Sequence, residues 1–317
     1  MSFADKKLTF GGAGAGILGP PWGIIGKVVA KAMAPLGYDI KINGDAWGQF
    51  NPRMVSDGEV DFGATRASNA MNAYKGKGGF ADKSRTNLRA IAAIQHPTWE
   101  AVAVRWETGI TSVADIKAKR YPVRVIGGDG PASHVVLEHY GITREVIESF
   151  GGSFRGSVPR GMDRLPRTQF SWVRAGDYDM ILGTIFAGFG PEVWQLHEAS
   201  ILHNLRFLPL DDECIRKLCE EEGGTPGLLP HHLLRGIEED IPSVMRLPQI
   251  VYGRDDMPDD FVYAVAKAVD ENAHLFREVY LAYSYDWRAA TNTAIPLHPG
   301  ALRYYQEKGY PIIKSLV

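Results

Sequence analysis

The sequence predicts an α/β protein of two lobes. Short apolar runs alternate with stretches of helical periodicity along nearly the whole chain, which is typical of sheets with helices packed on their faces. A chain of 317 residues is also long enough to bury two separate cores. We expect each lobe to hold a mainly parallel sheet flanked by helices. One lobe is expected to comprise residues 1–103 plus 248–317, and the other residues 104–247.

The first lobe begins with a strand and a strongly periodic helix. Residues 7–12 read KLTFGG, a short apolar run that ends in glycine. In residues 23–37 the apolar side chains recur at helical spacing, and Gly37 is the stop signal. By the same criteria, this lobe is expected to hold further strands at residues 38–43, 60–66 and 87–95 and further helices at residues 50–58, 259–280 and 298–309.

The second lobe is expected to repeat this alternation. A helix at residues 112–119 precedes a strand at residues 121–128, and the helix at residues 132–141 ends at a glycine. Further strands are expected at residues 178–183 and 205–210, and further helices at residues 191–200 and 211–224. The apolar runs at residues 100–105 and 247–253 are the best candidates for strands that cross between the lobes. Such crossing strands form hinges that close around ligands.

The composition excludes several kinds of partner and cofactor. The formal net charge is only −2, so the protein has no overall positive field that would attract nucleic acid or an anionic membrane. Cys214 and Cys219 lie five apart in an expected helix, where the thiols point about 140° away from each other, and we expect no disulfide. No His or second Cys pair lies at a ligand spacing from these two cysteines, so we expect them to bind no metal. We expect no cofactor either.

The location of the protein depends on how the chain begins. No stretch approaches the roughly 20 apolar residues that a membrane span needs, and we expect no direct membrane insertion. The opening MSFADKKLTF contains no signal peptide and leads directly into the first expected strand. The protein is therefore expected in the periplasm if a signal peptide has been removed from this chain, and otherwise in the cytoplasm.

The glycine-rich stretch TFGGAGAGILGPPWGIIG, residues 9–26, favours a small anion over a nucleotide. Its glycines miss the G-x-G-x-x-G spacing of dinucleotide-binding loops by one residue, and no Gly-Lys-Ser/Thr follows. A helix N-terminus needs only free backbone N–H groups to bind a carboxylate, and glycine lets the ligand approach closely. Gly14 and Ala15 are the expected contacts. Trp22 either joins them or packs the helix onto the sheet.

Several longer stretches resemble the TAXI family, the solute-binding subunits of tripartite (TRAP) secondary transporters. They are TFGGAGAG (residues 9–16), VSDGEVDFG (55–63), NAYKGKGGF (72–80), NLRAIAAIQ (87–95), GITSVADIKAKR (109–120), LPLDDE (208–213) and IPLHPGALRYYQEKG (295–309). The resemblance implies a two-lobed, type II periplasmic-binding-protein-like fold that closes on a small anionic solute without catalysis. It also implies TRAP permease subunits as membrane partners.

In the first lobe, the candidate ligand-binding residues follow strand ends. Ligands of open α/β sheets bind beyond the carboxyl ends of the strands. Arg66 ends the otherwise apolar strand VDFGATR and is suited to a two-pronged hydrogen bond with a carboxylate. Ser68 follows it. Trp47 and Gln49 follow the second strand, and Trp47 is expected to form an aromatic wall with Trp22 around a ring or apolar part of the ligand.

In the second lobe, the loop GGDGPASH repeats the pattern of the opening loop. It follows a strand and starts a helix, so Gly130, Ser133 and His134 are candidate contacts, with Ser133 as a hydrogen-bond donor. Phe186 and Phe189 mark a third such loop. The arginine-rich segment at residues 151–174 either reaches toward an anion or partner, or is a plain solvated loop.

These observations favour a solute-binding protein that captures a small organic acid, with or without an aromatic ring, between two lobes. The alternative is a cytoplasmic, cofactor-independent enzyme on the same scaffold, such as a decarboxylase or isomerase of an aromatic or dicarboxylic acid. The missing signal peptide and the arginine-rich segment favour that alternative. His96, Glu100 and His134 would then be the acid–base groups, with Arg66 gripping the substrate carboxylate.

Overall fold

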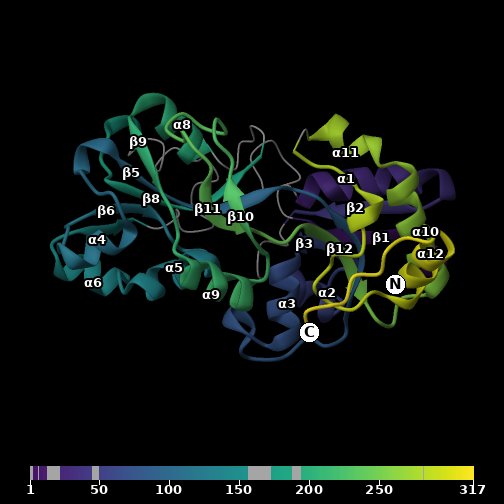
Figure 1. The fold of residues 1–317 in the computed structure, drawn as a ribbon. Coiled ribbons are helices and arrows are strands. Elements are labelled where there is room, and N and C mark those ends of the chain that lie inside the picture. Colours follow the sequence, from purple (N-terminus) through teal and green to yellow (C-terminus); the bar gives the residue numbers. More distant parts are fainter. Residues whose placement is uncertain are drawn as a thin grey trace. The chain divides into compact units, whose positions relative to one another are not determined.

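The computed structural model describes residues 3–5, 7–12, 22–44, 50–155, 173–187, 194–280 and 282–317. The chain forms two compact units, Met1–His96 with Leu247–Val317 (unit 1) and Pro97–Arg246 (unit 2). Each unit contains one mixed β-sheet with helices packed on its faces (Figure 1). The expected α/β class is therefore confirmed. The units change at residues 96/97 and 246/247, whereas the sequence suggested boundaries at 103/104 and 247/248, because the whole of the strand after residue 97 pairs within unit 2.

The sheet of unit 1 has the strand order β2-β1-β3-β12-β4. Its strands are β1 (Lys7–Gly11), β2 (Asp39–Asn43), β3 (Phe62–Arg66), β4 (Leu88–Ile94) and β12 (Gln249–Arg254). Strands β1, β2 and β3 run parallel, while β12 lies between β3 and β4 and is antiparallel to both. Since β4 therefore points the same way as β3, the carboxyl ends of four strands and the start of β12 meet at one edge.

Helices cover both faces of this sheet (Figure 1). One face carries α1 (Trp22–Met33), α10 (Asp259–Glu271), α11 (His274–Val279) and α12 (Pro299–Glu307), and the other carries α2 (Phe50–Ser56) and α3 (Ala67–Lys75). Helix α1 buries Ile25, Val28, Val29 and Ala32, the spacing that the sequence showed. After a short 3₁₀ turn the chain reverses at Gly37, whose φ of 84° is in the left-handed region.

Asn51, in the first turn of α2, ties three strands of unit 1 together. Its fully buried side-chain amide donates to the carbonyl oxygens of Gly11 (2.9 Å) and Ala64 (2.8 Å). The hydroxyl of Tyr252 donates to the amide oxygen of Asn51. A Cβ on Gly63 would lie 2.6 Å from the carbonyl oxygen of Gly11, so this close approach of β1 and β3 requires glycine.

The sheet of unit 2 has the strand order β10-β11-β5-β8-β6-β7, and β9 also pairs with β5. Its strands are β5 (Thr98–Arg105), β6 (Arg124–Gly127), β7 (Ser153–Arg155), β8 (Met180–Phe186), β9 (Leu205–Leu208), β10 (Thr225–Leu229) and β11 (Ile241–Met245). The pairs β8–β6 and β6–β7 are parallel, but β5 is antiparallel to all three of its neighbours. The sheet is therefore mixed, where the sequence suggested a mainly parallel one, because an apolar run indicates a buried strand without showing its direction.

Helices of unit 2 also lie on both faces of its sheet. One face carries α4 (Val113–Ala118), α5 (Pro131–Tyr140), α6 (Arg144–Ser149) and α9 (Asp212–Glu222), and the other carries α8 (Trp194–Leu202). Asp211 caps α9 by accepting a hydrogen bond from the backbone N–H of Cys214. Cys214 and Cys219 are both free thiols. Burial raises the pKa of the Cys214 thiol to about 12.

We predict that Asn51→Ala destabilises unit 1 by about 3 kcal/mol, because it leaves two buried carbonyls and the Tyr252 hydroxyl without their partner. Urea unfolding followed by circular dichroism measures this change. Gln306→Ala, at an exposed position of α12, is the control and should stay within about 0.5 kcal/mol of the parent. An Asn51→Ala protein as stable as the control would contradict the prediction.

Candidate functional site

Three helices of unit 1 follow strands that end at the carboxyl edge of its sheet. Strands β1, β2 and β3 are followed along the chain by α1, α2 and α3, and His96 follows β4 by two residues. The N-terminal ends of helices carry free N–H groups and a partial positive charge, which suit an anion. This edge, made here by Trp22, Arg66, Ser68, His96 and Gln249, is called the unit 1 edge below.

Arg66 is the last residue of β3 and occupies the N-cap position of α3, where its side chain makes no capping hydrogen bond. Its backbone is extended (φ −67°, ψ 140°), and it pairs in register with Gln249 on β12. Because side chains alternate along a strand, Arg66 lies on the same face of the sheet as Phe62 and Ala64, the face that α1 covers. Its side chain is half-buried, so a guanidinium stands at the strand end where the sequence placed it.

Trp22 and Gln249 form a buried pair at the same edge. The indole N–H of Trp22 donates to the side-chain oxygen of Gln249 at 2.6 Å, and Trp22 is 9% exposed. Trp22 thus packs α1 onto the sheet, which was one of its two expected roles. Gln249 was not predicted from the sequence, although a lone polar residue at the start of the apolar stretch LPQIVYG was the available signal.

His96 is enclosed by neutral groups and by Arg66. Its Nδ1 lies 3.5 Å from the side-chain nitrogen of Gln249, and its ring packs edge-on against Tyr280 and Tyr283. Burial, and to a smaller extent the charge of Arg66, lowers the pKa of His96 from 6.5 to about 3. The imidazole is therefore neutral at neutral pH, and Arg66 alone supplies positive charge among these five side chains.

Ser68 supplies a hydroxyl within the first turn of α3. The side chain is 1% exposed, and within the described part of the chain its Oγ has no hydrogen-bond partner. A buried hydroxyl normally finds a partner in the protein, in water or in a ligand. The remaining expected contacts of this lobe, Gly14, Ala15, Trp47 and Gln49, lie outside the described residues.

In unit 2, Glu100 of β5 is the centre of a buried polar network. The hydroxyl of Ser133, in the first turn of α5, donates to Glu100 Oε1 at 2.5 Å. Arg246 places one guanidinium nitrogen 3.3 Å from Glu100 Oε2 and another 3.3 Å from Glu222 Oε2. Thr184, opposite Glu100 on β8, lies 3.3 Å from the same carboxylate. We call these five residues the unit 2 network.

This network shows how the expected second-lobe residues are used. Ser133 donates its proton to Glu100, so toward a ligand its Oγ can offer only lone pairs, whereas the sequence suggested a donor. Within the described part of unit 2, the Glu100 carboxylate accepts hydrogen bonds from Ser133, Thr184 and Arg246. His134 is exposed and lines a separate pocket of about 260 Å³ together with Asp129 and Arg144.

Of the other three loop positions expected in unit 2, two are described. Gly130 is the residue before α5, and its extended backbone (φ −78°, ψ 152°) starts the helix. Phe186 is the last residue of β8, half-buried and paired with Thr98. Phe189 lies outside the described residues.

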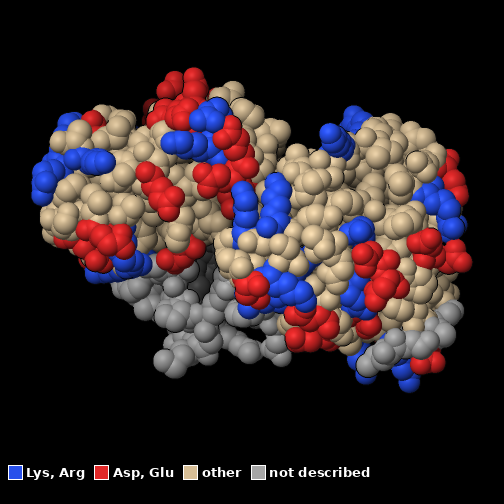
Figure 2. Space-filling view, turned by 90° about the horizontal axis from the view of Figure 1, so that it is seen from below, with Lys and Arg blue, Asp and Glu red and all other residues tan. Residues whose placement is uncertain are grey.

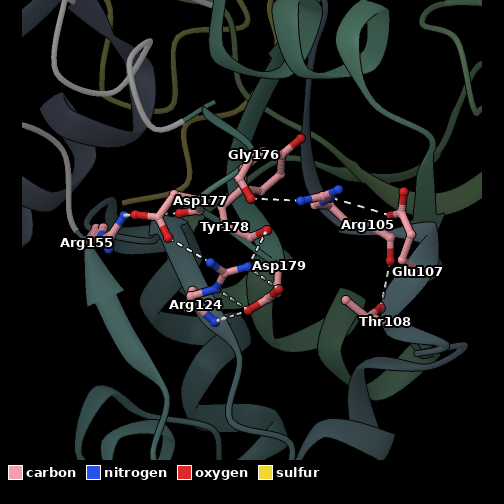
Figure 3. Close-up of polar contacts among 9 residues, drawn as sticks. All are labelled: Arg105, Glu107, Thr108, Arg124, Arg155, Gly176, Asp177, Tyr178 and Asp179. Carbon is pink, nitrogen blue, oxygen red and sulfur yellow. Dashed lines mark hydrogen bonds and ion pairs between the residues drawn. The ribbon is translucent and has the colours of Figure 1, made fainter. Parts of the chain in front are cut away.

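Two arginines of the arginine-rich segment, Arg155 and Arg174, are engaged in ion pairs, and Figure 3 shows that of Arg155. Arg155, at the end of β7, pairs with Asp177, and Arg124 bridges Asp177 (2.7 Å) and Asp179 (2.9 Å). The Arg155 guanidinium holds the pKa of Asp177 below its usual value. Arg174 pairs with Glu198 of α8 at 2.6 Å. Acidic residues outside the segment therefore oppose these two arginines; residues 156–172 lie outside the described residues.

The described surface carries mixed charges. Figure 2 shows basic and acidic side chains interspersed over one face, which matches the net charge of −2. The described residues contain no group of three His, Cys, Asp or Glu side chains that could hold a metal ion. Among the described helices, none combines the length and the apolar character needed to cross a bilayer.

These features define an α/β protein of two units, with an arginine and helix starts at the sheet edge of unit 1. The chain matches the NMT1-like family over residues 12–309 and belongs to that family. Similar solved structures include XAC2383 from Xanthomonas citri bound to chloride ion (12% identity, 95% of each chain, TM-score 0.49). They also include the glycine/betaine/L-proline-binding protein ProX from Borrelia burgdorferi (13% identity, 94% of this chain and 99% of that one, TM-score 0.44). A third is the periplasmic aliphatic sulphonate binding protein SsuA from Escherichia coli (13% identity, 95% of this chain and 82% of that one, TM-score 0.45).

We predict that His96 makes the stability of unit 1 depend on pH. Its pKa is about 3 when folded and 6.5 when unfolded, so between these values the unfolded chain binds the extra proton. The stabilisation is complete above pH 6.5 and falls by up to about 1.4 kcal/mol per pH unit as the pH drops toward 3. His96→Asn should remove this slope in urea unfolding measured from pH 7 to pH 4.5. The exposed His274→Asn is the control, and an equal change of slope in both variants would refute the assignment.

We predict that Arg246→Met destabilises unit 2 by about 3 kcal/mol or more, because it leaves the carboxylates of Glu100 and Glu222 buried without a cation. Arg216→Met is a matched control, since Arg216 also bridges two glutamates but lies on the surface of α9. The control should cost less than about 1 kcal/mol. Thermal unfolding of the two variants under the same conditions tests the difference, and similar losses would contradict it.

Proposed function

We propose that this protein is a solute-binding protein that captures a small organic acid, with the acid's carboxylate held at the unit 1 edge. The observation that carries the proposal is Arg66, whose half-buried guanidinium stands at the end of β3, at the N-cap position of α3. Two parallel N–H groups of an arginine match the two oxygens of a carboxylate. The N–H of Ala67 donates to the carbonyl oxygen of Pro248, and the following N–H groups in the first turn of α3 add further donors.

The charges of the described residues favour a singly charged acid group at this position. Arg66 is the one cation of the unit 1 edge as defined above, because His96 is neutral at physiological pH. Ser68 adds a buried hydroxyl that has no partner among the described residues. One guanidinium with neutral donors around it balances one carboxylate, whereas a phosphate dianion would remain partly uncompensated.

The transport role and the location rest on the sequence. The stretches that resemble the TAXI family span most of the chain, and that family delivers solutes to TRAP permeases. We therefore propose TRAP-type permease subunits as membrane partners and the periplasm as the place of action. Membership of the NMT1-like family agrees with a binding protein without fixing the type of transporter.

We predict that thermal-shift screening against aromatic, aliphatic and dicarboxylic acids finds at least one acid that stabilises the protein. A ligand at 100 times its Kd adds about 2.7 kcal/mol to the free energy of unfolding. Arg66→Ala should abolish the shift from any acid hit. Arg277→Ala, on the exposed side of α11, is the control and should retain it. A hit with an unchanged shift in Arg66→Ala would show that this arginine does not hold the ligand.

A further inference from the structure

The side-chain amide of Gln249 is buried between two hydrogen-bonding neighbours, Trp22 and His96. It is 1% exposed, and on β12 it lies directly between Arg66 of β3 and Ile94 of β4. Residues in register share a face of the sheet, so its side chain lies on the face that α1 covers. There it contacts Trp22 on one side and His96 on the other.

The indole of Trp22 determines which way the Gln249 amide points. An indole N–H is a donor only, so the atom 2.6 Å from it must be the amide oxygen. The amide NH₂ group then points away from Trp22 and toward Nδ1 of His96, at 3.5 Å. The orientation of the amide is thus fixed by the chemistry of its partner.

The NH₂ group in turn determines which ring nitrogen of His96 carries the proton. Since it can only donate, Nδ1 must accept and must carry no proton, and a neutral imidazole then holds its proton on Nε2. We propose that Gln249 is the positioning residue of the unit 1 edge, and that it holds His96 neutral with the proton on Nε2. An imidazolium would set an N–H of His96 against the N–H groups of Gln249. The lowered pKa of His96 agrees with this conflict.

The other groups packed against the ring do not favour its protonation. The described charged and titratable groups that face it are Arg66 from β3 and the phenols of Tyr280 and Tyr283 after α11. A cation repels an imidazolium, and a phenol is uncharged at neutral pH. Gln249 therefore acts in the same direction as its surroundings.

This inference rests on the proposed function in one respect, the pH dependence of ligand affinity. With His96 fixed as a neutral donor, the anion at the unit 1 edge owes its charge compensation to Arg66 alone. Affinity for an acid that is fully ionised should then stay constant within about twofold from pH 5.5 to pH 8. A site that used an imidazolium would instead lose affinity as the pH rises through the pKa of the histidine.

Nitrogen NMR of the full chain with ¹⁵N-labelled histidine tests the tautomer without any ligand. His96→Asn identifies the His96 signals by their loss. At pH 7, and down to pH 5, we expect one protonated nitrogen at Nε2 and one unprotonated nitrogen at Nδ1. A proton on Nδ1, or protons on both nitrogens at pH 7, would overturn the proposal.

Variants of Gln249 test whether it is the residue responsible. In Gln249→Glu the carboxylate accepts where the amide donated, so Nδ1 should become protonated at pH 7. In Gln249→Leu the unprotonated Nδ1 signal should be lost to exchange between tautomers. Gln306→Glu, on the exposed side of α12, should leave the His96 pattern unchanged. A native pattern in both Gln249 variants would overturn the role of Gln249.

One further variant guards against loss of folding at Gln249. Trp22→Phe keeps an aromatic ring in the core, although a smaller one, and removes the N–H that orients the amide, so the fixed Nδ1 pattern should again be lost. If Gln249→Leu does not fold, Gln249→Glu and Trp22→Phe decide the question. Failure of the proposed function would appear as the absence of any acid-induced shift, whereas the NMR pattern stands or falls by itself.

Discussion

Strand β12 enters the sheet of unit 1 between β3 and β4 and runs against both of them. The chain has by then passed through the whole of unit 2, so an inner strand of the unit 1 sheet comes from the last quarter of the sequence. Because β12 starts at the edge where β3 and β4 end, its first residue lies beside Arg66. The arrangement of Trp22, His96 and Arg66 depends on this one antiparallel pairing, which brings Gln249 among them.

The two units handle buried polarity in opposite ways. At the unit 1 edge the guanidinium of Arg66 is the one positive charge among the five side chains. Burial lowers the pKa of His96, so its imidazole is neutral. In the unit 2 network two buried carboxylates share one guanidinium, that of Arg246. Buried charges require partners, and in the unit 2 network Arg246 is the partner of both carboxylates.

The sequence predicted helix faces, helix ends and strand ends correctly, because these features depend on residues close together in the chain. The periodicity of α1 and the glycines after α1 and α5 gave the right helices and their ends, because helix faces and left-handed caps are set within a few residues. Arg66 was placed correctly at a strand end for the same reason. The direction of β5 was not predictable, since an apolar run is equally suited to parallel and antiparallel neighbours.

The roles of Gln249, Ser133 and Glu100 were not predictable from the sequence, because they depend on contacts between distant residues. Gln249 meets Trp22 across 227 positions and His96 across 153, and no spacing rule connects them. Ser133 and Glu100 were both singled out, but for different purposes, and their hydrogen bond follows only from the packing of α5 beside β5 and β8. The role of a polar residue in a sheet depends on which strand becomes its neighbour, and that is a property of the whole topology.

The two thiols of α9 have a practical consequence for spectroscopy. Burial disfavours the thiolate of Cys214 and raises the pKa of Cys219 as well. Thiolates are the form that reacts with maleimide dyes, so both native cysteines should label slowly at neutral pH. A single cysteine introduced on an exposed helix position would then carry a fluorophore without removal of either native one.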